Sequence, residues 1–226
     1  MASRLKTLIK SLLPEEIKDK LVFLKCGYGV SPYHGYNDLH RAIFIHIPKA
    51  AGTSVYTSLF GQVKRNHIRL IYFEAYDKNK FDKYFKFAFA RNPYDRLVSS
   101  FFYIKNKNDL YTPIIEKYST FDEFVDALND SNERKRIFGI PHFATQHHYL
   151  KDRFGKVGVD FLGKFENLES DFLKVKTKLK IEAELDHRNR SKHKPYMEYY
   201  TSRSLFVVNR IYQNDFSNLG YNIIKP

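Results

Sequence analysis

The 226-residue chain has a single cysteine, Cys26, and no apolar run that approaches the length of a membrane-spanning helix. One thiol cannot form an internal disulfide, and it excludes metal sites built from four thiolates. A spanning helix needs about 20 consecutive apolar residues. No metal-ligand spacing stands out either, so we expect no metal. The scarcity of cysteine favours a reducing compartment, and we expect the chain in the cytoplasm.

Acidic residues are outnumbered: 25 Asp and Glu stand against 38 Lys and Arg, which gives a formal net charge of +13. Such an excess favours polyanionic partners, among them nucleic acid, anionic lipid, phosphorylated cofactors and acidic polysaccharide. Tryptophan is absent, but 20 Phe and 17 Tyr supply aromatic surface for a core. These aromatics lie mainly at core spacings and no nucleic-acid-binding motif accompanies them, so we expect no nucleic-acid partner.

Internal repeats and low-complexity linkers are also absent, and the length fits one large domain preceded by an arm. We expect an amphipathic arm and a loop over residues 1–40 and the main domain over residues 41–226. One face of the arm would carry Leu5, Leu8, Ile9 and Leu12. Lysines interrupt this apolar stretch, which argues against a signal peptide. The arm either packs on the domain, which we favour, or makes a peripheral membrane contact. Residues 27–40, rich in Gly and Tyr, are interpreted as a loop.

Short apolar runs alternate with amphipathic segments along the main domain. Buried strands are predicted over residues 42–47, 85–90 and 160–165. Helices are predicted over residues 52–60, 93–105, 121–128, 166–179 and 201–215. This alternation is typical of an α/β domain with a central, mostly parallel sheet flanked by helices. Such sheets bind ligands at the carboxyl ends of their strands, and Lys49 and Arg91 both come just after a predicted strand.

The segment IHIPKAAGTS (45–54) combines a strand end, a tight turn and a helix start. Backbone N–H groups at a helix N-terminus favour an anion, and Gly52 permits close backbone approach. Thr53 and Ser54 add hydroxyl donors, and Lys49 adds a positive charge. The order differs from the GxxxxGK[ST] pattern of ordinary nucleoside triphosphate kinases, because the lysine precedes the only glycine. The segment therefore predicts a phosphate site of another kind; a capped helix with an unrelated lysine is the alternative.

A second anion site is predicted within FARNPYDRLVSSFF (89–102). Arg91 ends a strand, and Asn92 can cap a helix that carries Ser99 two turns along. An arginine can bind a phosphate with paired hydrogen bonds. Two anion sites at strand ends suit a nucleotide that is phosphorylated at two positions.

The two segments resemble the phosphate-binding motifs of sulfotransferases that use 3′-phosphoadenosine-5′-phosphosulfate (PAPS), in the carbohydrate sulfotransferase branch. Further similar stretches are HFATQHHYL (142–150), FLGKFENLESDF (161–172), SKHKPYMEYYT (191–201) and YQNDFSNLGY (212–221), so the resemblance covers roughly residues 42–222. It implies a three-layer, P-loop-like α/β fold. Together with the missing membrane anchor, it favours a bacterial or viral cytosolic enzyme.

The resemblance also implies the site residues. The 5′-phosphosulfate would be held by Lys49, Ala51, Gly52, Thr53 and Ser54. The 3′-phosphate would be held by Arg91 and Ser99. Apart from the resemblance, the basic charge of residues 186–196 predicts a ligand contact, with Ser191 and Lys192 as the candidates. This segment either closes over PAPS or contacts an acidic glycan; a solvated basic turn is the alternative. Ala50 stands where the family usually has Thr or another small residue, a change that should be tolerated.

The acceptor hydroxyl needs a base, and histidine suits this role because its ordinary pKa lies near neutral pH. His67 is our first candidate, since related enzymes often place a catalytic His or Glu between the two phosphate motifs, and Glu74 is the alternative. Lys49 would offset the charge that develops on the leaving phosphate. His46, within the first strand, is expected to be a packed core residue. Candidates for acceptor binding are His142, Gln146, His147 and His148.

The resulting hypothesis is transfer of a sulfuryl group from PAPS to a carbohydrate or glycoconjugate, and the basic charge suits an acidic polysaccharide. A nucleotide-dependent phosphotransferase is one alternative, but it would need a Mg²⁺-binding acid near the nucleotide, and none is evident. A basic nucleic-acid-binding protein is the second. An inactive relative is the third, and the presence of Lys49, Arg91 and Ser99 argues against it.

Overall fold

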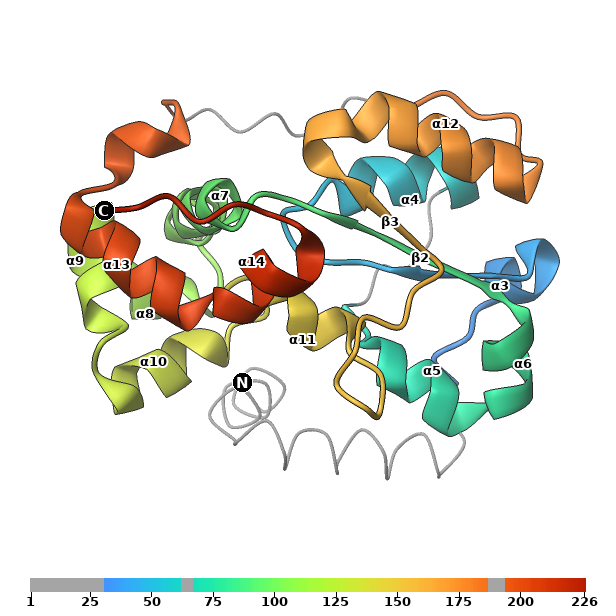
Figure 1. The fold of residues 1–226 in the computed structure, drawn as a ribbon, viewed down its shortest axis with the longest axis horizontal. Coiled ribbons are helices and arrows are strands. Elements are labelled where there is room, and N and C mark those ends of the chain that lie inside the picture. Colours follow the sequence, from blue (N-terminus) through green and yellow to red (C-terminus); the bar gives the residue numbers. More distant parts are fainter. Residues whose placement is uncertain (1–30, 62–66, 187–193) are drawn as a thin grey trace. The chain divides into compact units, whose positions relative to one another are not determined.

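The computed structural model describes residues 31–61, 67–186 and 194–226, and Figure 1 traces the chain through them. The amphipathic arm falls outside the described residues, so its packing, its membrane contact and the domain boundary at residue 40 remain predictions. In the described ranges, no helix is both long and apolar enough to cross a membrane.

The chain divides into two compact units, which have separate hydrophobic clusters. Of the described residues, the first unit contains 31–92 and 146–186, and we call it the sheet unit. The second contains 93–145 and 194–226, and we call it the helical unit.

Three parallel strands form the sheet: β1 (Ala42–Ile45), β2 (Phe85–Ala90) and β3 (Phe161–Lys164), in the order β1-β2-β3. The register pairs Ile45 with Ala88 and Ala90 with Lys164, so the carboxyl ends of the strands lie at one edge. β1 is buried throughout and β2 nearly so, as expected for parallel strands covered on both faces. All three strands lie within the predicted segments.

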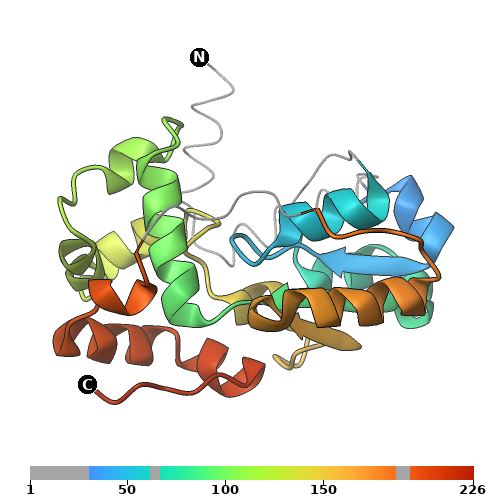
Figure 2. The same cartoon turned by 90° about the horizontal axis from the view of Figure 1, so that it is seen from above.

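Helices cover both faces of this sheet. The sheet unit contains α3 (Gly35–His40), α4 (Gly52–Phe60), α5 (Leu70–Tyr76), α6 (Lys78–Lys83), α11 (Gln146–Leu150), the 3₁₀ turn η1 (Phe165–Asn167) and α12 (Leu168–Leu179). α4 and α12 lie on one side of the strands and α5, α6 and α11 on the other (Figure 1). Figure 2 shows α4 and α12 from above. Phe44 and Phe87 of the sheet share a cluster with Val55 of α4 and Phe172 of α12, so both helices turn apolar faces to the strands. The three-layer α/β prediction is confirmed.

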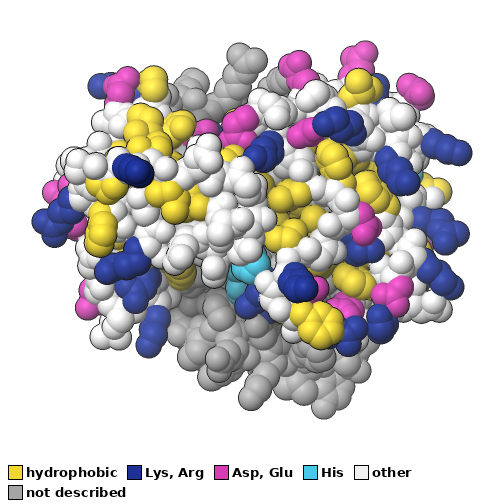
Figure 3. All heavy atoms as spheres, in the orientation of Figure 1, with side chains coloured by type: hydrophobic (Ala, Val, Ile, Leu, Met, Phe, Trp, Pro, Cys, Tyr) yellow, Lys and Arg dark blue, Asp and Glu magenta, His cyan; other side chains and the backbone are white. Residues whose placement is uncertain are grey.

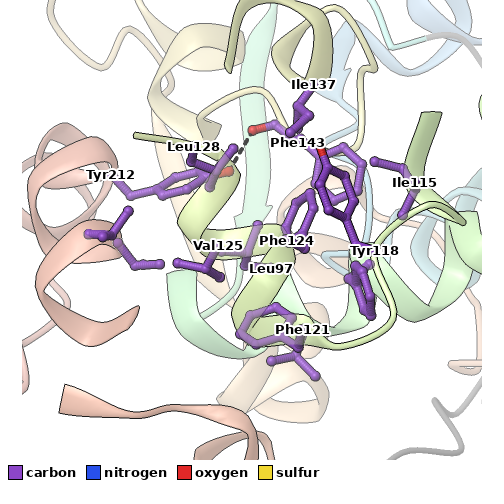
Figure 4. Close-up of a cluster of buried hydrophobic side chains, with 14 of the residues drawn as sticks. Leu97, Ile115, Tyr118, Phe121, Phe124, Val125, Leu128, Ile137, Phe143 and Tyr212 are labelled. Atoms are coloured by element: carbon purple, nitrogen blue, oxygen red, sulfur yellow. Dashed lines mark hydrogen bonds between the residues drawn. The ribbon is translucent and has the colours of Figure 1, made fainter. Parts of the chain in front are cut away.

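The helical unit packs around a core of aromatic and aliphatic side chains. Its elements are α7 (Pro93–Lys105), α8 (Thr112–Ile115), α9 (Phe121–Ala127), α10 (Ser131–Phe138), η2 (Tyr196–Tyr199), α13 (Ser202–Ile211) and α14 (Gln213–Leu219). Figure 4 shows Leu97, Phe124 and Phe143 within this core, where the Tyr212 hydroxyl donates to the carbonyl oxygen of Phe143 at 2.8 Å. Thr120 caps α9 as predicted, with its side chain accepting from the Glu123 N–H.

Two predicted segments differ from the structure. Part of the expected loop 27–40 is a helix, α3, whose Asn37 side chain is buried and donates to the Ala42 carbonyl oxygen at 2.7 Å. The helix predicted over 201–215 is divided at Tyr212, where α13 ends and α14 begins. The hydroxyl of the buried Tyr212 is hydrogen-bonded to the carbonyl oxygen of Phe143, and helical periodicity in the sequence does not indicate such a tertiary contact.

Candidate active site

The phosphate loop leaves β1 and enters α4 within residues 46–54. Lys49 and Ala51 both take left-handed backbone conformations, with φ of 67° and 59°. Non-glycine residues adopt this region at a cost of about 1–3 kcal/mol each, and such costs gather at ligand-binding loops. The Val55 N–H donates to the Ala51 carbonyl oxygen at 3.1 Å, so residues 52–54 form the first turn of α4. N–H groups in a first turn have no partner within their own helix, so this geometry suits the anion site that the sequence predicts here.

Gly52 is needed because of the His46 ring. A Cβ atom at position 52 would lie 1.8 Å from Cδ2 of His46 and 2.2 Å from its Nε2. His46 is 6 % exposed, so its imidazole fills the space beneath the start of α4, in line with its expected core position. Burial raises the pKa of the neighbouring Tyr56, so its phenol stays protonated near neutral pH. The sequence indicates close phosphate approach at Gly52, and the structure adds a packing reason for the same residue.

Arg91 follows β2 directly and reaches the phosphate loop. Its Nη1 donates to the carbonyl oxygen of Lys49 at 3.2 Å. Its guanidinium lies 4.2 Å from the ring centroid of Phe165, which comes just after β3. Arg91 of the second predicted anion site therefore contacts the loop of the first, and the ends of all three strands contribute to this arrangement.

Gln146 and Glu166 hold the backbone beside this guanidinium. The Arg91 N–H donates to Oε1 of Gln146 at 2.9 Å, and Nε2 of Gln146 donates to the Arg91 carbonyl oxygen at 2.7 Å. Glu166, expected to pair locally, accepts from the N–H of Asn92 at 2.7 Å, 74 residues away. Gln146 is fully buried, and its amide supports the backbone of Arg91 from both sides.

His67 lies beside the phosphate loop, where the sequence predicts a base. Its Nδ1 donates to the carbonyl oxygen of His46 at 3.0 Å, and the two rings lie 4.5 Å apart between centroids. Glu74, the alternative, forms an ion pair with Arg153 and its side chain is 11 % exposed. Glu74 is engaged by Arg153, whereas His67 contacts the phosphate loop directly, so the geometry favours His67.

The other predicted residues are dispersed. Ser99 is buried on α7 and His142 stacks on Tyr103, both in the helical unit, whereas His147 is buried on α11 of the sheet unit. His148 accepts from Arg69 at 3.0 Å. Ser191 and Lys192 lie outside the described residues. Among the described side chains, no three His, Cys, Asp or Glu residues are grouped to hold a metal ion.

The sequence of the chain was compared with those of known protein families. The sequence profile of the sulfotransferase family matches residues 36–222, which include the phosphate loop, His67, Arg91 and Glu166. The chain belongs to the sulfotransferase family. The resemblance stated from the two phosphate motifs is thereby confirmed.

Two of the chain's relatives have names that specify a class of substrate. Carbohydrate sulfotransferase 10 of Xenopus laevis is 25% identical over 236 residues, which cover 82% of this chain and 66% of that protein. Carbohydrate sulfotransferase 12 of Mus musculus is 26% identical over 176 residues, covering 64% and 42%. An uncharacterized protein of Archaeoglobus fulgidus is 33% identical over 111 residues, covering 49% and 80%. The chain thus spans only part of the named relatives. No solved structure gives a significant match.

The residues that support Arg91 are the ones whose role is hardest to recognise from the sequence. The stretch FLGKFENLESDF contains Phe165 and Glu166, and its similarity to the family marked it as relevant. Their contacts, with a guanidinium and a backbone N–H from another strand, depend on strand pairing. An aromatic residue followed by an acid at a strand end was the only local signal.

Proposed function

We propose that this sulfotransferase transfers a sulfuryl group from PAPS to a hydroxyl of a carbohydrate or glycoconjugate. The observation that carries the proposal is the hydrogen bond between the Arg91 guanidinium and the Lys49 carbonyl oxygen. It joins two cationic residues and a helix N-terminus into one anion-binding region. A donor with phosphate groups at both its 5′ and 3′ positions suits such a region better than a singly phosphorylated nucleotide.

The proposed reaction is an in-line displacement at sulfur. The acceptor oxygen forms a bond to sulfur while the bond from sulfur to the 5′-phosphate oxygen breaks. The hydroxyl proton passes to Nε2 of His67, and the product 3′-phosphoadenosine-5′-phosphate (PAP) retains the electron pair. Lys49 and the first turn of α4 stabilise the charge that grows on the leaving phosphate. Arg91 binds the 3′-phosphate, with Ser99 as a further contact carried over from the family, and Ser191 and Lys192 of the basic segment 186–196 are candidate donor contacts.

Carbohydrate acceptors are proposed because two relatives are named carbohydrate sulfotransferases. The net charge of +13 further suits an acidic polysaccharide. His142 and His147 remain candidates for acceptor contact.

The test is calorimetric binding of PAP, with ATP and adenosine-5′-phosphosulfate for comparison. Charge-assisted hydrogen bonds contribute about 1.5–3 kcal/mol, so Arg91→Ala should weaken PAP binding roughly 10- to 150-fold. Lys49→Ala should also weaken PAP binding, because it removes the proposed contact with the 5′-phosphate. Lys78→Ala removes one charge from an exposed i,i+4 ion pair on α6 and should leave binding unchanged. Equal affinity for PAP and for nucleotides without a 3′-phosphate would contradict the proposal.

A further inference from the structure

His46 contacts the proposed base through both its backbone and its side chain. Its carbonyl oxygen accepts from Nδ1 of His67 at 3.0 Å. Its imidazole lies 4.5 Å from the His67 ring between centroids, at an interplanar angle of 54°. The same imidazole occupies the space that a side chain at Gly52 would take. One residue thus touches both the base and the first turn of the phosphate loop's helix.

The backbone contact fixes where His67 carries its proton. A carbonyl oxygen can only accept a hydrogen bond, so neutral His67 is protonated at Nδ1 and has its lone pair at Nε2. Nε2 is therefore the atom that can take the acceptor's proton. When it does, the Nδ1–H bond to the carbonyl remains and stabilises the positive charge on the ring.

The His46 ring is itself held from two sides. It stacks on Phe44 of β1, with 6.1 Å between centroids and planes 13° apart, and it lies 6.2 Å from the ring of Tyr56 on α4. At 6 % exposure, it has little freedom to turn without displacing Gly52 or His67. A shift of the His46 ring would therefore move Gly52 or His67 as well.

We propose that His46 is a positioning residue, whose imidazole sets the separation and the orientation between His67 and the turn at Gly52. It acts by contact with these two residues and needs no contact with donor or acceptor. The proposal rests on the proposed function, in which His67 is the base.

The test combines histidine NMR with kinetics. Long-range ¹⁵N–¹H spectra of the ligand-free protein distinguish a ring protonated at Nδ1 from one that exchanges between tautomers, and the His67 signals are assigned by their loss in His67→Gln. His46→Ala keeps the carbonyl oxygen that accepts from Nδ1 but removes the imidazole beside the His67 ring, so that ring can turn away from the carbonyl and its signals should move toward the tautomer average. Misplacement by about 1 Å can cost on the order of 10²-fold in rate, so kcat should fall by that order while the KM for PAPS changes little.

Leu59→Ala is the matched control. Leu59 is buried on α4, in the hydrophobic cluster that contains Phe44 and Tyr56, and its truncation should lower the melting temperature without changing the His67 signals or kcat. If His46→Ala does not fold, His46→Asn is the smaller change and should show the same effects in weaker form. Folded variants with native His67 signals and native kcat would overturn the proposal. Absence of sulfotransfer by the native chain would contradict the proposed function and not the contact, because the spectra need no substrate.

Discussion

At the scale of single residues, Gln146 departs furthest from its expected role. The sequence predicts an acceptor contact, since Gln146 stands among three histidines. In the structure its amide is buried and joins both backbone polar groups of Arg91. A single side chain in this way fixes the position of a cation that belongs to a different segment, 55 residues away.

We expect Gln146→Leu to weaken PAP binding while leaving the Arg91 side chain intact. The substitution removes the partners of a buried N–H and a buried carbonyl, and each unsatisfied group costs about 1–3 kcal/mol. Stability should therefore fall by at least about 2 kcal/mol, measured by urea unfolding, and PAP affinity should fall in calorimetry. Gln213→Leu, at an exposed position on α14, is the control and should change neither. Native PAP affinity in folded Gln146→Leu would show that the amide does not hold Arg91.

At the scale of elements, the three strands and the helices α4 and α12 on one face of the sheet could be predicted from the sequence. Apolar runs indicate the strands, and apolar residues at helical spacing indicate α12, because burial of these side chains determines both sequence patterns. The short helices α5, α6, α8, α10 and α11 were not predicted. Each has eight residues or fewer, too few turns for a period to be recognised. The turn from β1 into α4 could be predicted because its sequence signals are local, whereas the support of Arg91 by Phe165 and Gln146 depends on tertiary contacts.

The pairing of β3 with β2 depends on a glycine. Gly163 pairs with Phe89, and a Cβ atom at position 163 would lie 2.6 Å from Cε1 of the Phe89 ring and 3.2 Å from Cβ of Asp171. We expect Gly163→Ala to lower the free energy of unfolding by about 1–3 kcal/mol, the usual cost of overpacking. Thermal unfolding followed by circular dichroism would measure this change.

Gly35→Ala is the matched substitution for this prediction. A Cβ atom there would have no neighbour within 4 Å, and Gly35 begins α3. Alanine loses less backbone entropy on folding than glycine, so this variant should be neutral or more stable by up to about 1 kcal/mol. A Gly163→Ala protein as stable as the native chain would mean that β3 can move away from Phe89.

At the scale of the whole molecule, the positive charge is spread and not concentrated. Figure 3 shows Lys and Arg side chains distributed over the face it draws, with acidic side chains among them. Some cations of the described residues are paired with carboxylates, as in the ion pairs of Lys117 with Glu133 and of Lys78 with Asp82. A net charge of +13 carried in this way attracts polyanions over a distance but does not by itself select one.

If the acceptor is an acidic polysaccharide, its KM should rise with salt. At 0.1 M ionic strength the Debye length is about 10 Å, so attraction between the net positive surface and a distant polyanion is largely screened above this concentration. We therefore expect the KM for an acidic acceptor to increase between low and physiological salt, while that for a neutral oligosaccharide stays nearly constant. Initial rates at saturating PAPS would measure both, because the donor contribution is then held fixed. If the KM values for the two acceptors depended equally on salt, the net charge of the protein would not contribute to binding of the acidic acceptor.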